Sequence, residues 1–192
     1  HLEYWGSMDA LVQGFREFAG KVPFFGFSAL CLDHPVVQSL IPSIRRKTVT
    51  YGLGAQAEVR GLDLRFQGMR TTFKVTRDEQ QLGEVTLGMP GQHNVCNALA
   101  AISIGLEIGL DFSQIASGLD DFSGVDRRFT VRDRVPLGDG SAPVTIIDDY
   151  GHHPAEISAT LTAASKAFPD SRVIAVFQPH RYSRVLALQD DF

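Results

Sequence analysis

Two apolar segments near the carboxyl end of the chain stop abruptly at clusters of charged and imidazole side chains. The first, 144–148, runs into the sequence DDYGHHP at 148–154, and the second, 172–177, runs into QPHRYSR at 178–184. A buried parallel strand looks like this when its carboxyl end opens into a ligand crevice. Two neighbouring strand ends would gather carboxylates, imidazoles and guanidiniums around one pocket, which suits an anionic substrate or a nucleotide. The alternative is a pair of ordinary surface loops.

The first part of the chain shows other periodicities. Apolar spacing predicts a helix over 7–21, a strand over 24–32, a short helix from Pro35 and a strand over 48–53. From 57 to 87 the period changes to two, which predicts an antiparallel meander.

A helix is expected over 95–106, with a second over 112–119. Residues 124–126 are typical of a linker. After the linker, strands at 129–131, 144–148 and 172–177 surround a helix at 154–168. This alternation predicts a parallel sheet with crossover helices, and therefore an α/β fold.

Composition limits the classes of function. The net charge of −4 argues against a general nucleic-acid or membrane-surface partner. No apolar run is long enough to span a membrane, and no signal-like segment opens the chain. Cys31 and Cys96 have no metal or redox spacing, so we expect small buried residues in a reducing compartment. The chain opens on His1 and closes without a helix-stop signal, as an internal piece of a longer protein would, and it carries no signal for the oligomeric state.

The segment GQHNVCN at 91–97 opens a helix and places Asn94 and Asn97 on its first turns. Amides beside a helix amino end suit hydrogen bonding to a base or a phosphate ester. Equally, Asn94 could serve only as a helix cap. Arg127 and Arg128, at the expected junction, could clamp a phosphate or a carboxylate, or could simply be surface charge.

Asp148 and Asp149 could accept hydrogen bonds from ribose hydroxyls or hold a divalent cation. Since neighbouring strand residues point to opposite faces, only one is expected to face the site. His152 and His153 precede Pro154 at a helix amino end, where the dipole favours neutral imidazole. Zinc is disfavoured, because it would require His180 to converge on the pair.

His180, Arg181 and Arg184 cluster after the last predicted strand. If a helix starts there, the two arginines share one of its faces and form a natural carboxylate receptor. A solvated basic helix start is the alternative. Cations at a helix amino end oppose its dipole, so a bound anion explains them better.

Taken together, the segments GQHNVCN (91–97), RRF (127–129), DDYGHHP (148–154) and QPHR (178–181) resemble those of the Mur ligases of peptidoglycan synthesis. The forms YGHHP and QPHR are most similar to the branch that adds L-alanine. The resemblance implies part of a central P-loop-type ATPase domain over 1–126, which includes the antiparallel meander. It implies part of a Rossmann-like, amino-acid-binding domain with a parallel sheet over 127–192.

The resemblance also implies a reaction. ATP, with Mg²⁺, would phosphorylate the lactyl carboxylate of UDP-N-acetylmuramate, and the amine of L-alanine would attack the acyl phosphate to form an amide in the cytoplasm. The family's glycine-rich phosphate loop is absent from this sequence, so we expect no ligase activity from the segment alone. The alternative function is a stand-alone module that binds a nucleotide or an amino acid.

Residue roles follow from the same resemblance. It assigns His1 to magnesium. It assigns Asn94 and Asn97 to adenine and ribose, Arg128 to phosphate and Asp149 to ribose. The residues assigned to L-alanine and the reacting carboxylate are Tyr150 and the four catalytic residues His152, His180, Arg181 and Arg184. Phe15 and Arg16 stand where other Mur ligases carry a carbamoylated lysine, so we expect no such modification.

Overall fold

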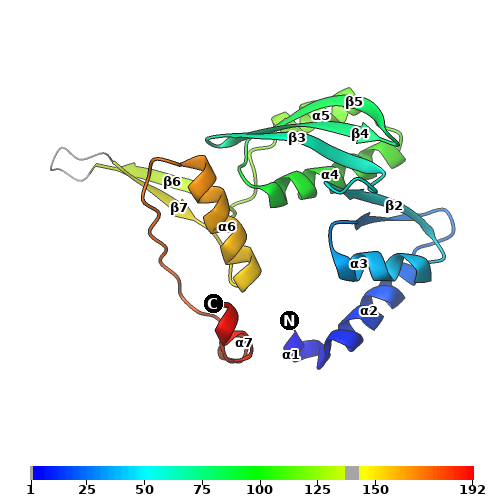
Figure 1. Ribbon diagram of the computed structural model, residues 1–192, viewed down its shortest axis with the longest axis horizontal. Helices are drawn as coiled ribbons and strands as arrows, with labels where there is room; N and C mark the ends of the chain where they lie inside the picture. Colours follow the sequence, from blue (N-terminus) through cyan, green and yellow to red (C-terminus); the bar gives the residue numbers. More distant parts are fainter. Residues whose placement is uncertain (1, 137–142) are drawn as a thin grey trace.

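The computed structural model describes residues 2–136 and 143–192 of the chain, arranged around two sheets (Figure 1). The larger sheet has five strands in the order β1-β2-β3-β4-β5. Its part of the chain contains α1 (Leu2–Trp5), α2 (Met8–Gly20), β1 (Phe27–Cys31), α3 (Pro35–Leu40), η1 (Ile41–Ser43), β2 (Lys47–Gly52), β3 (Val59–Gln67), β4 (Arg70–Arg77), β5 (Gln80–Leu87), α4 (Gln92–Glu107) and α5 (Phe112–Asp120).

The smaller sheet is a two-stranded ribbon. Its part of the chain contains β6 (Thr130–Val135), β7 (Val144–Asp148), α6 (Pro154–Ala167), α7 (Tyr182–Ala187) and η2 (Gln189–Asp191). Within the described ranges, no helix combines the length and the apolar character needed to cross a bilayer.

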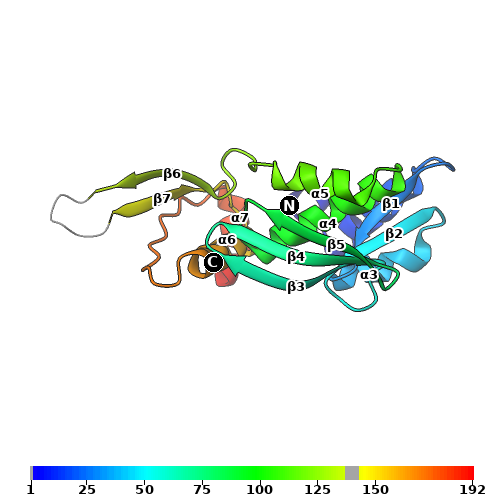
Figure 2. The ribbon, with the colours of Figure 1, turned by 90° about the horizontal axis from the view of Figure 1, so that it is seen from above.

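The larger sheet is mixed. Strands β1, β2 and β3 pair in parallel, whereas β3, β4 and β5 form the predicted antiparallel meander. Helices α4 and α5 lie along one face of this sheet (Figure 2). Val95, Leu99 and Ile102, spaced three or four residues apart on α4, are fully buried against it. The apolar residues that recur every 3.6 residues on α4 and every second residue on the strands therefore pack into one core.

Helix α6 joins the two parts of the chain. Its buried face consists of Ala163, Ala164 and Ala167, and it contacts α4 and β3. A Cβ atom at Gly91, whose φ is +102°, would lie 3.1 Å from the Cβ of Ala163. A close approach of α6 to the start of α4 thus depends on small side chains. The Nζ of Lys166 lies 4.9 Å from the centre of the Phe66 ring and extends the contact.

The strand predicted over 172–177 is wrong. These residues have no regular secondary structure, and Val173, Ile174 and Val176 are 41%, 70% and 97% exposed. Within the described residues, β7 pairs with β6 alone, and the pairing is antiparallel. A parallel strand needs a hydrogen-bonded neighbour and cover on both faces, and the described chain supplies neither around 172–177. The α/β fold class itself is confirmed, with its second sheet an antiparallel ribbon.

Leu99→Ala should lower the free energy of unfolding by about 2–5 kcal/mol, because Leu99 is fully buried between α4 and the sheet and truncation leaves a cavity. Ile104→Ala is the matched control on the same helix, where the side chain is 45% exposed and a much smaller loss is expected. Chemical denaturation of the three proteins measures the difference. Equal losses at both positions would contradict the packing described.

Glu107 ties three elements together through ion pairs with Lys47 of β2 and Arg77 of β4. Hydrogen bonding from Lys47 holds the pKa of Glu107 below its usual value, although burial opposes this. The lowered pKa means that the pairs stabilise the fold fully above the ordinary carboxyl pKa and lose effect as the pH falls through the folded value. Glu107→Gln should therefore destabilise the protein at neutral pH, and the difference from the parent should shrink in acid.

Unfolding free energies of both proteins at several pH values test this expectation. Glu84→Gln is the control, because its pair with Arg65 is exposed and should contribute at most about 1 kcal/mol. A Glu107→Gln deficit that stays constant from neutral to strongly acid pH would count against the ion pairs as its cause.

Candidate active site

The loop that follows β7 is fixed by hydrogen bonds to the backbone. The carboxylate of Asp149 accepts bonds from the backbone N–H of Phe129 at 2.9 Å and of Gly151 at 2.7 Å. The backbone N–H of Tyr150 donates to the carbonyl oxygen of Arg127 at 2.7 Å. Asp149 thereby holds the junction and the loop in one geometry.

Its neighbour Asp148 points elsewhere. The Asp148 carboxylate accepts a bond of 3.0 Å from Arg132 on the adjacent strand and lies 4.0 Å from Arg127. The two neighbouring carboxylates therefore have separate sets of partners, and which of them faces a ligand stays a prediction.

The two junction arginines diverge. The guanidinium of Arg127 lies over the ring of Tyr150, 4.7 Å from its centre. Arg128 instead lies 3.6 Å from the carboxylate of Glu156, and about half of its side chain is exposed. One cation therefore positions an aromatic ring, whereas the other presents charge beside the start of α6.

Glu156 is a site residue that the sequence analysis missed. Its carboxylate accepts hydrogen bonds from the backbone N–H groups of His152, at 3.0 Å, and His153, at 3.2 Å. Burial raises the pKa of Glu156, but these bonds and the nearby charges of His152 and Arg128 outweigh it, so the net pKa is lowered. The spacing from His153 to Glu156 is that of a capping box, and this signal could have identified the residue.

His152 is oriented as well as anchored. Its Nδ1 atom lies 3.0 Å from the carbonyl oxygen of Tyr150, and the two rings meet edge to face with centroids 5.2 Å apart. The imidazole and the phenol thus stand together at the amino end of α6.

The amino end of α4 faces this loop. His93 is half-buried, and its pKa is lowered by burial and by the charge of Arg128, with the charge of Asp149 acting in the opposite direction. His93 therefore favours the neutral form at pH 7, and it was not among the predicted site residues.

Asn94 is not the cap of α4, because the helix begins at Gln92 and Gly91 occupies the N-cap position. The Asn94 amide donates to the carbonyl oxygen of Pro90 at 2.8 Å. The Asn97 amide nitrogen lies 3.5 Å from Asn94 Oδ1, and Asn97 is exposed. The two amides form a short row along the first turns of the helix.

The two arginines of the predicted carboxylate receptor differ in exposure. Arg181 has extended backbone, precedes α7 and is exposed, whereas Arg184 lies within α7 and is buried, with 4% exposure. Nη1 of Arg184 donates to the carbonyl oxygen of His180 at 3.0 Å. His1, predicted as a magnesium ligand, lies outside the described residues.

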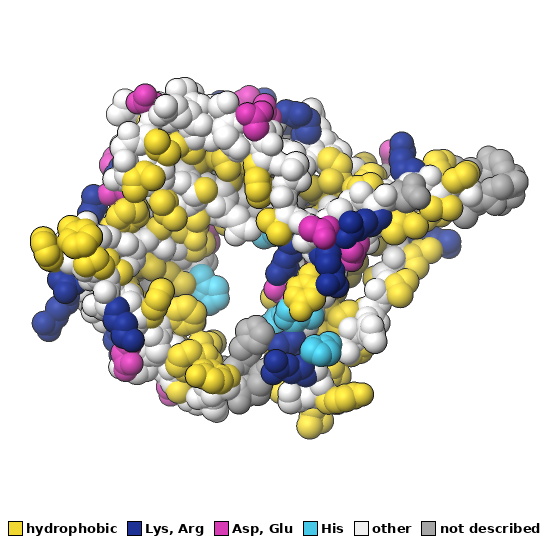
Figure 3. Space-filling model, turned by 180° about the vertical axis from the view of Figure 1, so that it is seen from behind, with side chains coloured by type: hydrophobic (Ala, Val, Ile, Leu, Met, Phe, Trp, Pro, Cys, Tyr) yellow, Lys and Arg dark blue, Asp and Glu magenta, His cyan; other side chains and the backbone are white. Residues whose placement is uncertain are grey.

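Seen from behind, the molecule has a wide opening with cationic and imidazole side chains gathered along one side (Figure 3). The arrangement offers hydrogen-bond acceptors, neutral imidazole and fixed guanidinium charge within a loop and two helix starts. Such a set can bind a polyanion with hydroxyl groups and neutralise charge that develops on it.

Two family models match successive parts of the chain. A family model described as the Mur ligase middle domain matches residues 1–105, and one described as the Mur ligase, glutamate ligase domain matches 127–189. The UDP-N-acetylmuramate–L-alanine ligase of Salinibacter ruber is 46% identical over 192 residues, which is 100% of this chain and 39% of the relative. The chain thus spans about two fifths of that relative's length.

Two crystal structures show similar folds. The UDP-N-acetylmuramate–alanine ligase of Thermotoga maritima is 27% identical, with a TM-score of 0.77 over 98% of this chain and 41% of that one. The MurF ligase of the same organism, solved in complex with ADP, is 18% identical, with a TM-score of 0.70 over 86% of this chain and 36% of that one.

Glu156→Ala should destabilise the start of α6 by about 1–2 kcal/mol, since it removes the acceptor of two helix-end N–H groups. Hydrogen exchange should report the change locally, as faster exchange of the His152 and His153 amides. Glu79→Ala, in the exposed turn between β4 and β5, is the control and should leave both amides protected. Unchanged protection in Glu156→Ala would show that the carboxylate does not hold this loop.

Proposed function

Since this chain belongs to the Mur ligase family, we propose that it is part of an ATP-dependent ligase that joins L-alanine to UDP-N-acetylmuramate. The observation that carries the proposal is the 46% identity, over all 192 residues, to a relative named as that ligase. A protein with the same fold has been solved in complex with ADP, which supports a nucleotide site. We place the reaction in the cytoplasm, where ATP is available.

The proposed reaction has two steps. The lactyl carboxylate of UDP-N-acetylmuramate attacks the γ-phosphorus of ATP, and ADP leaves to give an acyl phosphate. The amine of L-alanine then attacks the acyl carbon, and the tetrahedral intermediate collapses to the amide and inorganic phosphate. Positioning and charge neutralisation supply most of the catalysis in such phosphoryl and acyl transfers.

We assign the nucleotide to the space between α4 and the loop after β7. We assign the neighbouring amides of Asn94 and Asn97 to adenine and ribose, and Asp149 has acceptor capacity left for a ribose hydroxyl. Arg128, half-exposed, would approach the phosphates. Because His93 is neutral, Arg128 would be the cation that contacts the phosphates of the nucleotide from this side.

We assign L-alanine and the reacting carboxylate to Tyr150, His152, His180, Arg181 and Arg184. The first two already stand together at the start of α6. Arg181 is exposed whereas Arg184 is buried, so a carboxylate receptor that uses both would require a rearrangement of the segment before α7. Exposure throughout 171–183 is consistent with a segment that can change position.

Magnesium accompanies ATP in reactions of this kind and would neutralise phosphate charge. The residue assigned to it, His1, lies outside the described residues. A single imidazole is also a poor match to a cation that prefers oxygen ligands. We therefore route no step through the metal.

Asp149→Asn should lower kcat/KM for ATP about 10- to 100-fold, which corresponds to the loss of one hydrogen bond to a charged group. Asp148→Asn is the matched control, because that neighbouring carboxylate pairs with Arg132, and a change below about threefold is expected. The assay measures phosphate release by the complete protein that contains this chain, with UDP-N-acetylmuramate, ATP and L-alanine. Thermal unfolding separates loss of function from loss of fold, since Asp149 also holds the loop.

Phosphate release that requires both UDP-N-acetylmuramate and L-alanine would support the ligase. Nucleotide binding without turnover under all substrate combinations would instead favour the binding-module alternative.

A further inference from the structure

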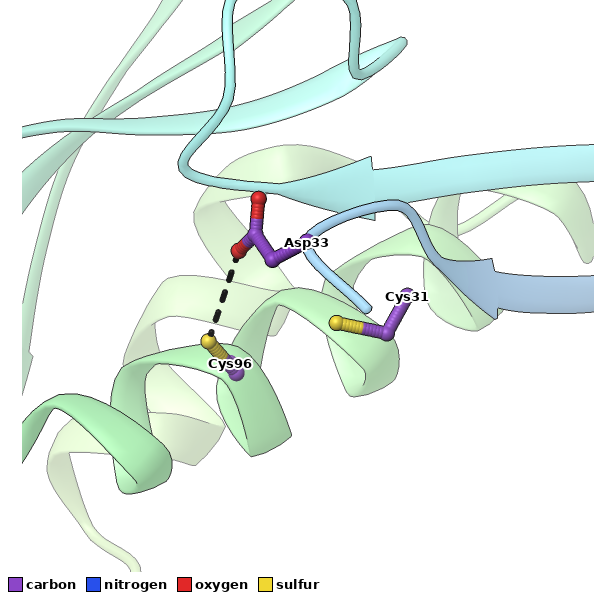
Figure 4. A group of neighbouring side chains, drawn as sticks. All are labelled: Cys31, Asp33 and Cys96. Atoms are coloured by element: carbon purple, nitrogen blue, oxygen red, sulfur yellow. Dashed lines mark hydrogen bonds between the residues drawn. The ribbon is translucent and has the colours of Figure 1, made fainter. Parts of the chain in front are cut away.

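Two side chains that lie close in sequence, Cys31 and Asp33, meet the distant Cys96 at the carboxyl end of β1 (Figure 4). The sulfur atoms of Cys31 and Cys96 and a carboxylate oxygen of Asp33 all lie within 4.8 Å of one another. The Cys96 thiol donates to Asp33 Oδ2 at a distance of 3.9 Å. Both cysteines are free thiols and only partly buried, so the expectation that they are buried is wrong.

The Asp33 carboxylate is held in place by the backbone. Its Oδ1 atom accepts bonds from the N–H groups of Leu53, at 3.0 Å, and Gly54, at 2.9 Å, and Oδ2 is 2.8 Å from the Leu53 nitrogen. A Cβ atom at Gly52 would lie 2.6 Å from Oδ1, so this approach requires a glycine there. The hydrogen bonds fix the carboxylate while Oδ2 keeps a lone pair on the side of the thiols.

These donors match the preferences of a borderline-soft divalent ion. Tetrahedral zinc, with bonds of about 2.3 Å to sulfur and about 2.1 Å to oxygen, places its ligand atoms roughly 3.5–3.8 Å apart. The 3.9 Å separation of Cys96 Sγ from Asp33 Oδ2 is already close to that value. Hydrogen bonds to a ligating carboxylate are the outer-shell support that such sites use.

We propose that Cys31, Asp33 and Cys96 bind a divalent ion of the zinc type, with two thiolates and one carboxylate as ligands and a solvent molecule in the fourth position. Each thiol releases its proton to solvent as its sulfur–metal bond forms. The ion would connect the end of β1, the backbone at 53–54 and the second turn of α4. This site is chemically distinct from any magnesium bound with ATP, because thiolates are poor ligands for magnesium.

A regulatory disulfide between the same cysteines explains less of the geometry. It would need the sulfurs to approach to about 2.05 Å, and it would not involve the carboxylate that lies beside them.

The test uses the complete protein that contains this chain, freed of metal with a chelator under reducing conditions. Titration with Co²⁺ should give thiolate-to-cobalt charge-transfer absorption and the visible bands of tetrahedral cobalt. Both signals should saturate at one equivalent of cobalt per protein. Zn²⁺ should then displace the cobalt and abolish both signals.

Cys31→Ser and Cys96→Ser should each weaken Co²⁺ binding at least about 100-fold, since even outer-shell partners contribute about 10- to 100-fold. His34→Gln is the control: it removes an imidazole next to Asp33 that is not one of the three donors, and it should bind as the parent does. Circular dichroism verifies that each variant is folded, and the two cysteine variants test the site independently.

The absence of a thiolate-to-cobalt signal in the parent protein would overturn the proposal. The same signal, undiminished, in both folded cysteine variants would also overturn it. Loss of two hydrogens from the intact mass on mild peroxide treatment, with no cobalt binding by the reduced protein, would assign the pair to disulfide chemistry instead.

Discussion

The close packing of α6 against the start of α4 determines where the candidate active site lies. Small side chains favour it, because a Cβ atom at Gly91 would lie 2.6 Å from the His93 ring and 3.1 Å from the Cβ of Ala163. Helix α6 carries the loop after β7 at its amino end, so its position fixes where Asp149 and Arg128 act on His93. The apolar core of the larger sheet provides the rigid base for this contact.

The loop itself is organised by backbone groups as much as by side chains. Glu156 and Asp149 each accept bonds from two backbone N–H groups, and these bonds hold the imidazoles and the phenol in defined positions. The hydrogen bonds to Glu156 favour its charged form and lower its pKa, although burial opposes this. The carboxylates of Glu156 and Asp149 thus hold the loop in one conformation before a substrate binds, while guanidinium and imidazole groups form the rest of its surface.

Helix α4 links the proposed nucleotide site to the thiol cluster. Cys96 lies between Asn94 and Asn97 in sequence but turns toward β1, where it meets Cys31 and Asp33 (Figure 4). The same first turns therefore carry the amides proposed for the nucleotide and one ligand of the proposed metal site. A bound ion would stabilise this part of the fold by mass action, because the unfolded chain does not hold the three donors together.

Local pattern determined most of the fold. The two-residue period of 57–87 and the apolar face of α4 identified the meander and the helix that covers it, because each periodicity reflects burial against one neighbour. The abrupt polar end of 144–148 likewise identified the loop after β7. The strand expected at 172–177 failed, because strand formation depends on a hydrogen-bonded partner that a local apolar run does not specify.

Only the tertiary structure brought distant groups together. No spacing rule connects Cys31 with Cys96, or His93 with Asp149, since each pair meets through packing between separate elements. The same holds for Arg184, which is buried although it carries a charge and which donates to the carbonyl oxygen of His180. The sequence by itself determined which side chains were available and which elements carried them, because helix and strand periods are local. Packing decided which of them meet, because that depends on contacts between residues far apart in the chain.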